Sequence, residues 1–161
     1  MQSELFSRRI IVVRDDTTGA KVNRFVVDCS VTAAWCFQDE QNNYVDTVLD
    51  ALQTFHGIVP PIWLLEMVNV FLDAERRNRL KEAETFHFFH LLESLPIEIY
   101  SSTRKQEGEI LLTTGRKYSL SSYDAAYLYL AMQENCPLAT QDGKLKKACK
   151  NAGVALFMEG C

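Results

Sequence analysis

The chain has 161 residues, of which 47% are hydrophobic and 24% charged, with few glycines and prolines. This composition is typical of one folded globular domain and excludes the disordered and fibrous classes. The formal net charge of −4 argues against a protein that grips nucleic acid over its whole surface. It is compatible with a nuclease whose acidic side chains gather around a cation.

The cysteines predict a reducing environment. There are five, scattered, without a C-x-x-C pair, which favours free thiols over a disulfide framework or a zinc site. No apolar run approaches the roughly 20 residues of a membrane span. Residues 1–9 are charged, and the apolar run 10–13 is too short for a signal-peptide core. We therefore expect a cytoplasmic protein without a membrane segment.

The first 24 residues differ from the rest and are interpreted as an N-terminal extension. Residues 10–13 and 21–27 suit the two strands of a hairpin, with a turn at 15–19. A loose extension fits the same residues equally well.

From Phe25 onward, short apolar runs alternate with longer helical stretches, and residues 25–161 form the predicted domain. In the strongest helix, 63–80, the spacing of leucines and Phe71 predicts one apolar stripe, at Leu64, Leu65, Val68, Phe71 and Leu72. Such alternation predicts right-handed crossovers and a parallel sheet covered on both faces, a three-layer α/β/α fold. The predicted strands are 25–27, 58–59, 97–99, 138–140 and 154–156, and the predicted helices are 30–37, 43–55, 63–80, 83–95, 103–117, 122–134 and 143–151.

Four acids fall where this reading places strand ends or helix starts. Asp28 directly follows a strand, and Asp142 lies two residues beyond Thr140. Sites in α/β sheets lie outside the carboxyl ends of the strands. Glu66 begins helix 63–80 and points away from its apolar stripe, whereas Asp124 begins a helix that is apolar nearly all round.

Each acid alone has a structural explanation. Asp28 and Asp142 suit helix caps, Glu66 suits a helix dipole, and Ser121 with Asp124 fits a capping box. As a set they predict more, because converging carboxylates repel one another. Hard divalent cations such as Mg²⁺ and Mn²⁺ prefer oxygen ligands and assist in-line displacement at a phosphodiester.

Four blocks of the chain resemble, in order and spacing, the PIN-domain proteins, and more narrowly the VapC-type toxins of bacterial toxin–antitoxin pairs. The blocks are 25–31 with Trp35, 60–66 with Asn69, 120–127, and 138–142. The resemblance implies a PIN-like α/β/α domain with a short parallel sheet. It also implies a metal-dependent endoribonuclease acting on tRNA, rRNA or mRNA, a homodimer, and inhibition by an antitoxin protein.

By position in those blocks, the resemblance implies an acidic set that binds Mg²⁺ or Mn²⁺, namely Asp28, Glu66, Asp124 and Asp142. Ser30 and Thr140 match hydroxyl positions that line the family's site, and Asn69 matches a polar neighbour. Two features depart from the pattern: Cys29 stands where alanine is usual, and residues 1–24 have no counterpart.

Three alternatives remain open. A Mg²⁺ phosphatase or receiver-like domain would use Asp28 as nucleophile and need little from Glu66. A non-catalytic PIN-like module would bind RNA or protein without cutting, and in a plain α/β domain the acids would serve only as caps. Glu84 and His87 form a single Glu-x-x-His, which does not make a di-iron site. The basic clusters at 76–79, 116–117 and 144–150 are interpreted as solvated helix faces.

Overall fold

The computed structural model describes residues 23–100 and 107–160, so the predicted hairpin or extension lies outside the described residues up to residue 22. Its sheet has the strand order β3-β2-β1-β4, and every neighbouring pair is parallel. The strands are β1 (Arg24–Val27), β2 (His56–Val59), β3 (Ile97–Ile99) and β4 (Leu138–Ala139).

The strand order places a topological switch between β1 and β4. From β1 the chain builds outward through β2 and β3, and β4 then returns to the other side of β1. Val27 is in register with Ala139, and the Asp28 amide donates to the Ala139 carbonyl at 2.9 Å. The residues that follow β1 and β4 therefore emerge side by side at one edge, the position where α/β sheets commonly build sites.

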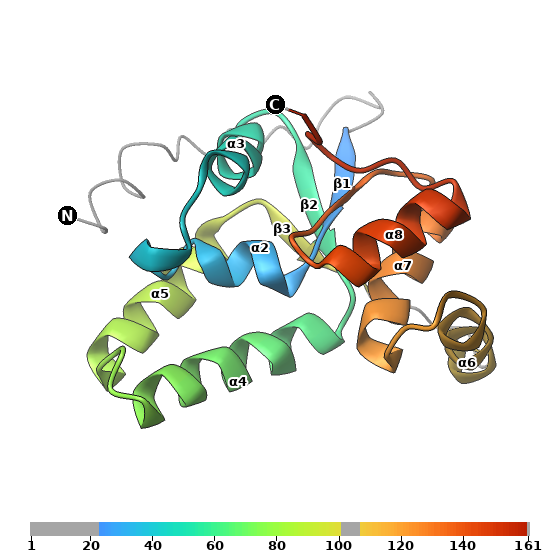
Figure 1. The fold of residues 1–161 in the computed structure, drawn as a ribbon. Coiled ribbons are helices and arrows are strands. Elements are labelled where there is room, and N and C mark those ends of the chain that lie inside the picture. The colour runs from blue at the N-terminus through green and yellow to red at the C-terminus, as the bar shows by residue number, and fades with distance from the viewer. Residues whose placement is uncertain (1–22, 101–106, 161) are drawn as a thin grey trace.

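Helices lie on both sides of the sheet, which confirms the three-layer α/β/α prediction (Figure 1). Left-handed residues follow several of them, for example Asn135 after α7 and Gly153 after α8, as is common at helix C-termini. The helices are α2 (Cys29–Ala34), α3 (Asn43–Ala51), α4 (Ile62–Arg76), α5 (Glu82–Ser94), α6 (Glu107–Tyr118), α7 (Ser122–Glu134) and α8 (Gly143–Ala152), with a short 3₁₀ helix η1 (Gln38–Glu40).

The core forms around β1, whose residues Phe25, Val26 and Val27 are fully buried because both faces of the sheet are covered. Phe157 stacks on Phe25 with ring centroids 3.9 Å apart, so the C-terminal segment packs against the first strand. No helix among the described residues is long and apolar enough to cross a membrane.

The predicted apolar face of α4 is wrong at four of its five residues, and only Phe71 is buried as predicted. The buried residues of this helix are Trp63, Met67, Phe71 and Ala74. The leucine stripe is exposed: Leu64 37%, Leu65 61%, Val68 37% and Leu72 42%. The helix carries two apolar faces, and periodicity alone does not say which one faces the core. The Trp63 indole helps to fix the choice, since it donates to the buried Thr32 hydroxyl at 2.9 Å.

Boundaries differ at several elements. Helix α4 ends at Arg76 and not at residue 80, because Asn78 adopts a left-handed φ of 56° that interrupts the helix. The strand predicted at 154–156 reduces to a single bridge between Leu156 and Leu138. The predicted start of α6, residues 103–106, lies outside the described residues.

Candidate active site

Asp28 is a buried carboxylate held by two hydroxyl groups. Its side chain is only 6% exposed, and one of its oxygens accepts from Ser30 Oγ at 2.5 Å and from Thr140 Oγ1 at 2.7 Å. Asp28 occupies the N-cap position of α2 without making a side-chain capping hydrogen bond. Its role is therefore not that of a simple helix cap.

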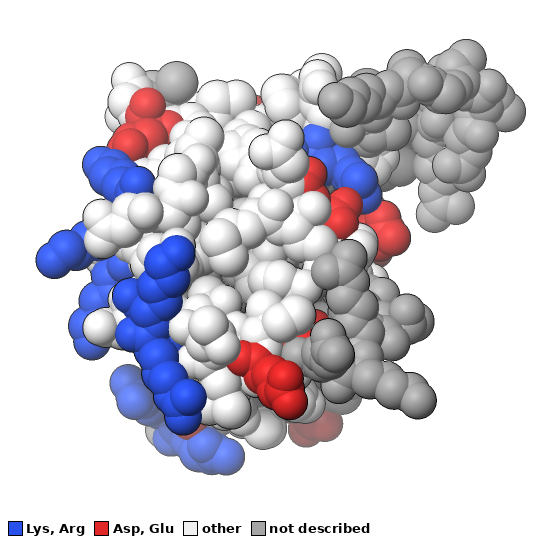
Figure 2. Space-filling model, turned by 90° about the vertical axis from the view of Figure 1, so that its right-hand side faces the viewer, with Lys and Arg blue, Asp and Glu red and all other residues white. Residues whose placement is uncertain are grey.

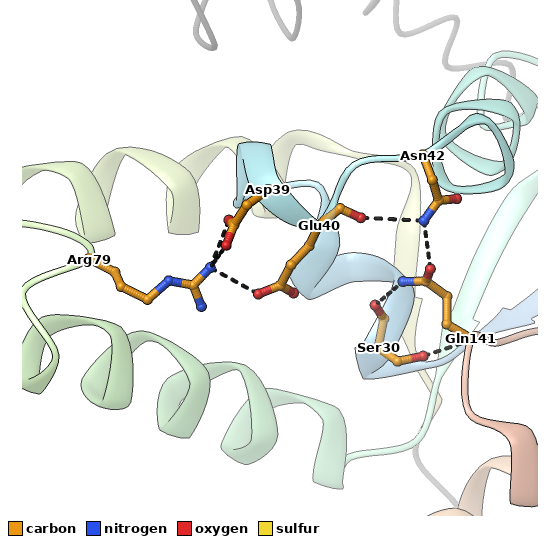
Figure 3. Close-up of polar contacts among 6 residues, drawn as sticks. All are labelled: Ser30, Asp39, Glu40, Asn42, Arg79 and Gln141. Carbon is orange, nitrogen blue, oxygen red and sulfur yellow. Dashed lines mark hydrogen bonds and ion pairs between the residues drawn. The ribbon is translucent and has the colours of Figure 1, made fainter.

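The same hydroxyls tie the loop after β4 to α2. Ser30 Oγ accepts from the Gln141 amide and Thr140 Oγ1 from the Asp142 amide, both at 3.0 Å. Figure 3 shows the Gln141 side chain between the Ser30 carbonyl, to which it donates at 3.0 Å, and Asn42, from which it accepts at 2.8 Å. The sequence did not identify Gln141 or Asn42. The only signal was that Gln141 lies between two predicted site residues.

Glu66 is half-buried on α4 and accepts a hydrogen bond from a side chain of α7. The hydroxyl of fully buried Tyr127 donates to Glu66 Oε2 at 2.5 Å. Burial raises the pKa of Tyr127, so the phenol stays protonated and remains a donor. In the sequence, Tyr127 lies on the helix that is apolar nearly all round. Its polar contact was missed because the two residues are 61 positions apart and the surroundings of Tyr127 in the sequence are apolar.

Three of the predicted acids share one electrostatic environment. Burial raises the pKa of Asp28, the Ser30 and Thr140 hydroxyls partly offset this, and the charge of Asp124 adds to it. Burial also raises the pKa of Glu66, the Tyr127 hydroxyl offsets it, and the charges of Asp28 and Asp124 raise it further. These carboxylates, from three separate elements, are therefore close enough to repel one another.

The other helix-start acids make capping contacts. The Asp124 amide donates to Ser121 Oγ at 3.1 Å, and that hydroxyl donates to Asp124 Oδ2 at 2.8 Å. Asp142 Oδ1 accepts from the Leu145 amide at 2.7 Å. Asp142 is linked to the buried acid of β1 through the Thr140 hydroxyl, to which its amide donates.

Asn69, predicted as a polar neighbour of the site, lies three residues after Glu66 on α4 and is exposed. No hydrogen bond joins its side chain to any other residue of 23–100 or 107–160. Its predicted supporting role stays a prediction.

A divalent cation fits the chemistry of this set but not yet its arrangement. Among the described residues, no three His, Cys, Asp or Glu side chains are placed to hold a metal ion. The available donors are carboxylate oxygens, which suit Mg²⁺ or Mn²⁺. Burial, and to a smaller extent neighbouring negative charge, raises the pKa values of Asp28 and Glu66, and a cation would stabilise their ionised forms. To hold a cation together, these side chains would have to lie closer to one another than they do here.

Cys29 adds no soft ligand or nucleophile to the site. Burial raises the pKa of its thiol, and the charges of Glu66 and Asp28 raise it further, so the thiolate is disfavoured. The described cysteines are all free, as the sequence predicts.

The fold and the site together define the class of this protein: a parallel α/β/α domain with acidic residues at its topological switch point. The sequence model of the PIN-domain family matches residues 25–151. The chain therefore belongs to this family, whose members are generally nucleases. No curated protein matches the chain in sequence.

Two solved structures have the same fold. The crystal structure of PAE2754 from Pyrobaculum aerophilum has a TM-score of 0.59 and 22% identity, covering 79% of this chain and 86% of that one. The crystal structure of FitAcB from Neisseria gonorrhoeae has a TM-score of 0.56 and 16% identity, covering 83% of this chain and 96% of that one. At these identities the likeness extends to the fold alone.

Proposed function

We propose that this protein is a Mg²⁺- or Mn²⁺-dependent endoribonuclease that hydrolyses RNA phosphodiesters. The proposal is supported by a PIN-domain fold in which Asp28 is buried beside the switch point of the sheet, Glu66 is half-buried, and the charge of Asp124 acts on both. Asp142 lies at the same edge, one hydroxyl away from Asp28. These four acids are the proposed metal ligands.

The residues around the acids hold them for this task. Ser30 and Thr140 fix one oxygen of Asp28, and Tyr127 fixes one oxygen of Glu66. The chemistry that a cation would supply here is neutralisation of charge on the phosphodiester and activation of water. No histidine or cysteine is required as a base or a nucleophile in this scheme.

The phosphatase alternative fits Asp28 poorly. A carboxylate that is 6% exposed, with one oxygen accepting two hydroxyl hydrogen bonds, is badly placed to attack a phosphoryl group. The non-catalytic alternative predicts RNA binding without turnover, and the experiment below separates it from the nuclease.

We further propose that the protein acts in the cytoplasm as the toxin of a toxin–antitoxin pair and forms a homodimer. The VapC-like order of the four sequence blocks supports the toxin role. The exposed stripe of α4, Leu64 to Leu72, supports coverage of this helix by protein, since contiguous apolar surface marks interaction sites. Light scattering tests the dimer, and co-purification with the product of the neighbouring gene tests the antitoxin.

The test of the nuclease is incubation of purified tRNA and of a single-stranded RNA with Mg²⁺, Mn²⁺ or EDTA. Asp28→Asn is the inactive variant, and Asp73→Asn is the matched control, because Asp73 is exposed and pairs with Arg76 on its own helix. We expect discrete metal-dependent products from the wild type and the control, and none from Asp28→Asn. Equal cutting by Asp28→Asn would exclude the proposed site.

A further inference from the structure

The basic clusters of the chain differ in how far their charge is neutralised. On α4, Arg76 pairs with Asp73 at 2.6 Å. In the turn after this helix, Arg79 pairs with Asp39 at 2.8 Å and with Glu40 at 3.0 Å (Figure 3). These arginines are committed to local ion pairs. Their positive charge is largely cancelled by their neighbours.

Four other cations are not committed in this way. Lys144 and Lys147 on α8, and Arg116 and Lys117 in the last turn of α6, are all exposed. None of them has an ion-pair partner among residues 23–100 and 107–160, whereas Lys150 pairs with Glu159 at 3.1 Å. Figure 2 shows Lys and Arg side chains gathered along one edge of the face that carries α6 and α8 in Figure 1.

These cations lie on the two elements that flank the acids of the site. Lys144 follows Asp142 by two residues, and the α6 pair stands just before the turn that leads to Asp124. Helix α7 packs against both α6 and α8. A polyanion approaching the acids would be repelled, and unpaired cations on the neighbouring helices would oppose that repulsion.

We propose that Lys144, Lys147, Arg116 and Lys117 form a basic track that binds the phosphate backbone of single-stranded RNA and guides it to the acids. This inference rests on the proposed nuclease function and adds the surface that would position the substrate. Backbone contacts of this kind carry no base specificity, so the track sets affinity and register, not the sequence that is cut. An acidic protein can bear such binding only because its cations are local and unpaired.

The test is fluorescence anisotropy with a labelled 20-nucleotide oligouridylate in EDTA, where no metal-dependent cutting interferes. The variants are Lys144→Gln/Lys147→Gln and Arg116→Gln/Lys117→Gln. The matched control removes two charges from the other cluster, as Arg76→Gln/Arg79→Gln, because both of these arginines are held in ion pairs. Each track variant should lose roughly tenfold or more in affinity at ~0.1 M salt, and its salt dependence should flatten by about 1.4 in log–log slope. The control should stay within about twofold of the wild type, since it leaves the track intact.

Several results would overturn the track: no binding by the wild type, unchanged affinity and slope in both track variants, or an equal loss in the control. These outcomes are separable from failure of the nuclease. RNA that is bound through the track but never cut in Mg²⁺ or Mn²⁺ removes the proposed function and supports the track. If the track variants bind RNA with normal affinity and still cut it, the track is refuted and the proposed nuclease function is retained.

Discussion

Replacing Thr140 with valine removes one hydroxyl from the centre of the candidate site. Thr140 is fully buried, and valine fills nearly the same volume, so the hydroxyl is the main loss. That hydroxyl donates to the Asp28 carboxylate at 2.7 Å and accepts from the Asp142 amide at 3.0 Å. Thr140→Val therefore measures how strongly the network stabilises a buried charge.

The size of the effect follows from these two bonds. A hydrogen bond to a charged group contributes about 1.5–3 kcal/mol, and a neutral one about 1 kcal/mol. The second loss is smaller here, because Asp142 is exposed and water can reach its amide. We expect the free energy of unfolding to fall by about 2–4 kcal/mol, which lowers the Tm of a chain of this length by roughly 5–15 °C.

The assay is urea and thermal unfolding in EDTA, with and without Asp28→Asn. Thr140→Ser keeps the hydroxyl, loses one methyl group and should cost only about 1 kcal/mol. In the Asp28→Asn background the hydroxyl donates to a neutral oxygen, so Thr140→Val should cost about 1–2 kcal/mol less than in the wild type. An equal cost in both backgrounds would refute the reasoning, as would a serine variant as unstable as the valine variant.

Three further outcomes are expected. Tyr127→Phe removes the donor to Glu66, so it should lower the free energy of unfolding by about 1–3 kcal/mol and weaken Mg²⁺ binding by calorimetry; an unchanged Mg²⁺ affinity would argue against a role in holding Glu66. Asp142→Asn should keep the wild-type Tm, because asparagine caps a helix as well as aspartate does, but it should lose RNA cleavage. Asp142→Ala should lose cleavage and also about 1 kcal/mol of unfolding free energy. Full cleavage by the asparagine variant would mean that Asp142 is only a helix cap. Burial raises the pKa of Asp28 above its unfolded value, so the contribution of this group to stability is complete below the unfolded pKa and is lost as pH rises through the folded pKa. Asp28→Asn should therefore gain stability relative to the wild type as pH is raised from ~4 to ~7 in EDTA. A stability difference that does not change with pH would contradict this.

Much of the fold could be predicted from local pattern. The helix at 122–134 and the strand at 97–99 have the predicted bounds. A serine cap marks the start of the helix, and two β-branched isoleucines around Glu98 mark the strand. The face of α4 could not be chosen, since leucines and Trp63, Met67 and Phe71 make two competing apolar sides. Only tertiary packing decides between them. The strand order, which places β4 beside β1, was likewise not readable from the sequence.

The candidate site was predictable where its residues follow a strand, and not where partners come from distant elements. Asp28 and Thr140 each follow a strand, so the α/β pattern predicts both at the same edge of the sheet. The observed strand order, with β4 beside β1, then brings them into contact. The contact of Tyr127 with Glu66 depends on how α7 packs beside α4, which no spacing rule encodes. The same holds for Asn42, which reaches Gln141 across 99 residues.

Capping and the proposed metal binding would coincide at this edge for a geometric reason. In a parallel sheet each following helix begins at the carboxyl edge, and helix starts favour Ser and Asp. Caps such as Asp142 therefore gather where ligands can bind, and the two roles do not compete. Capping cannot account for Asp28 or Glu66, because neither helix has a side-chain cap at its start. Burial of both acids raises their pKa values and opposes their ionised forms. Because burial opposes ionisation of these two carboxylates, their presence points to a chemical role, and binding a divalent cation would be such a role.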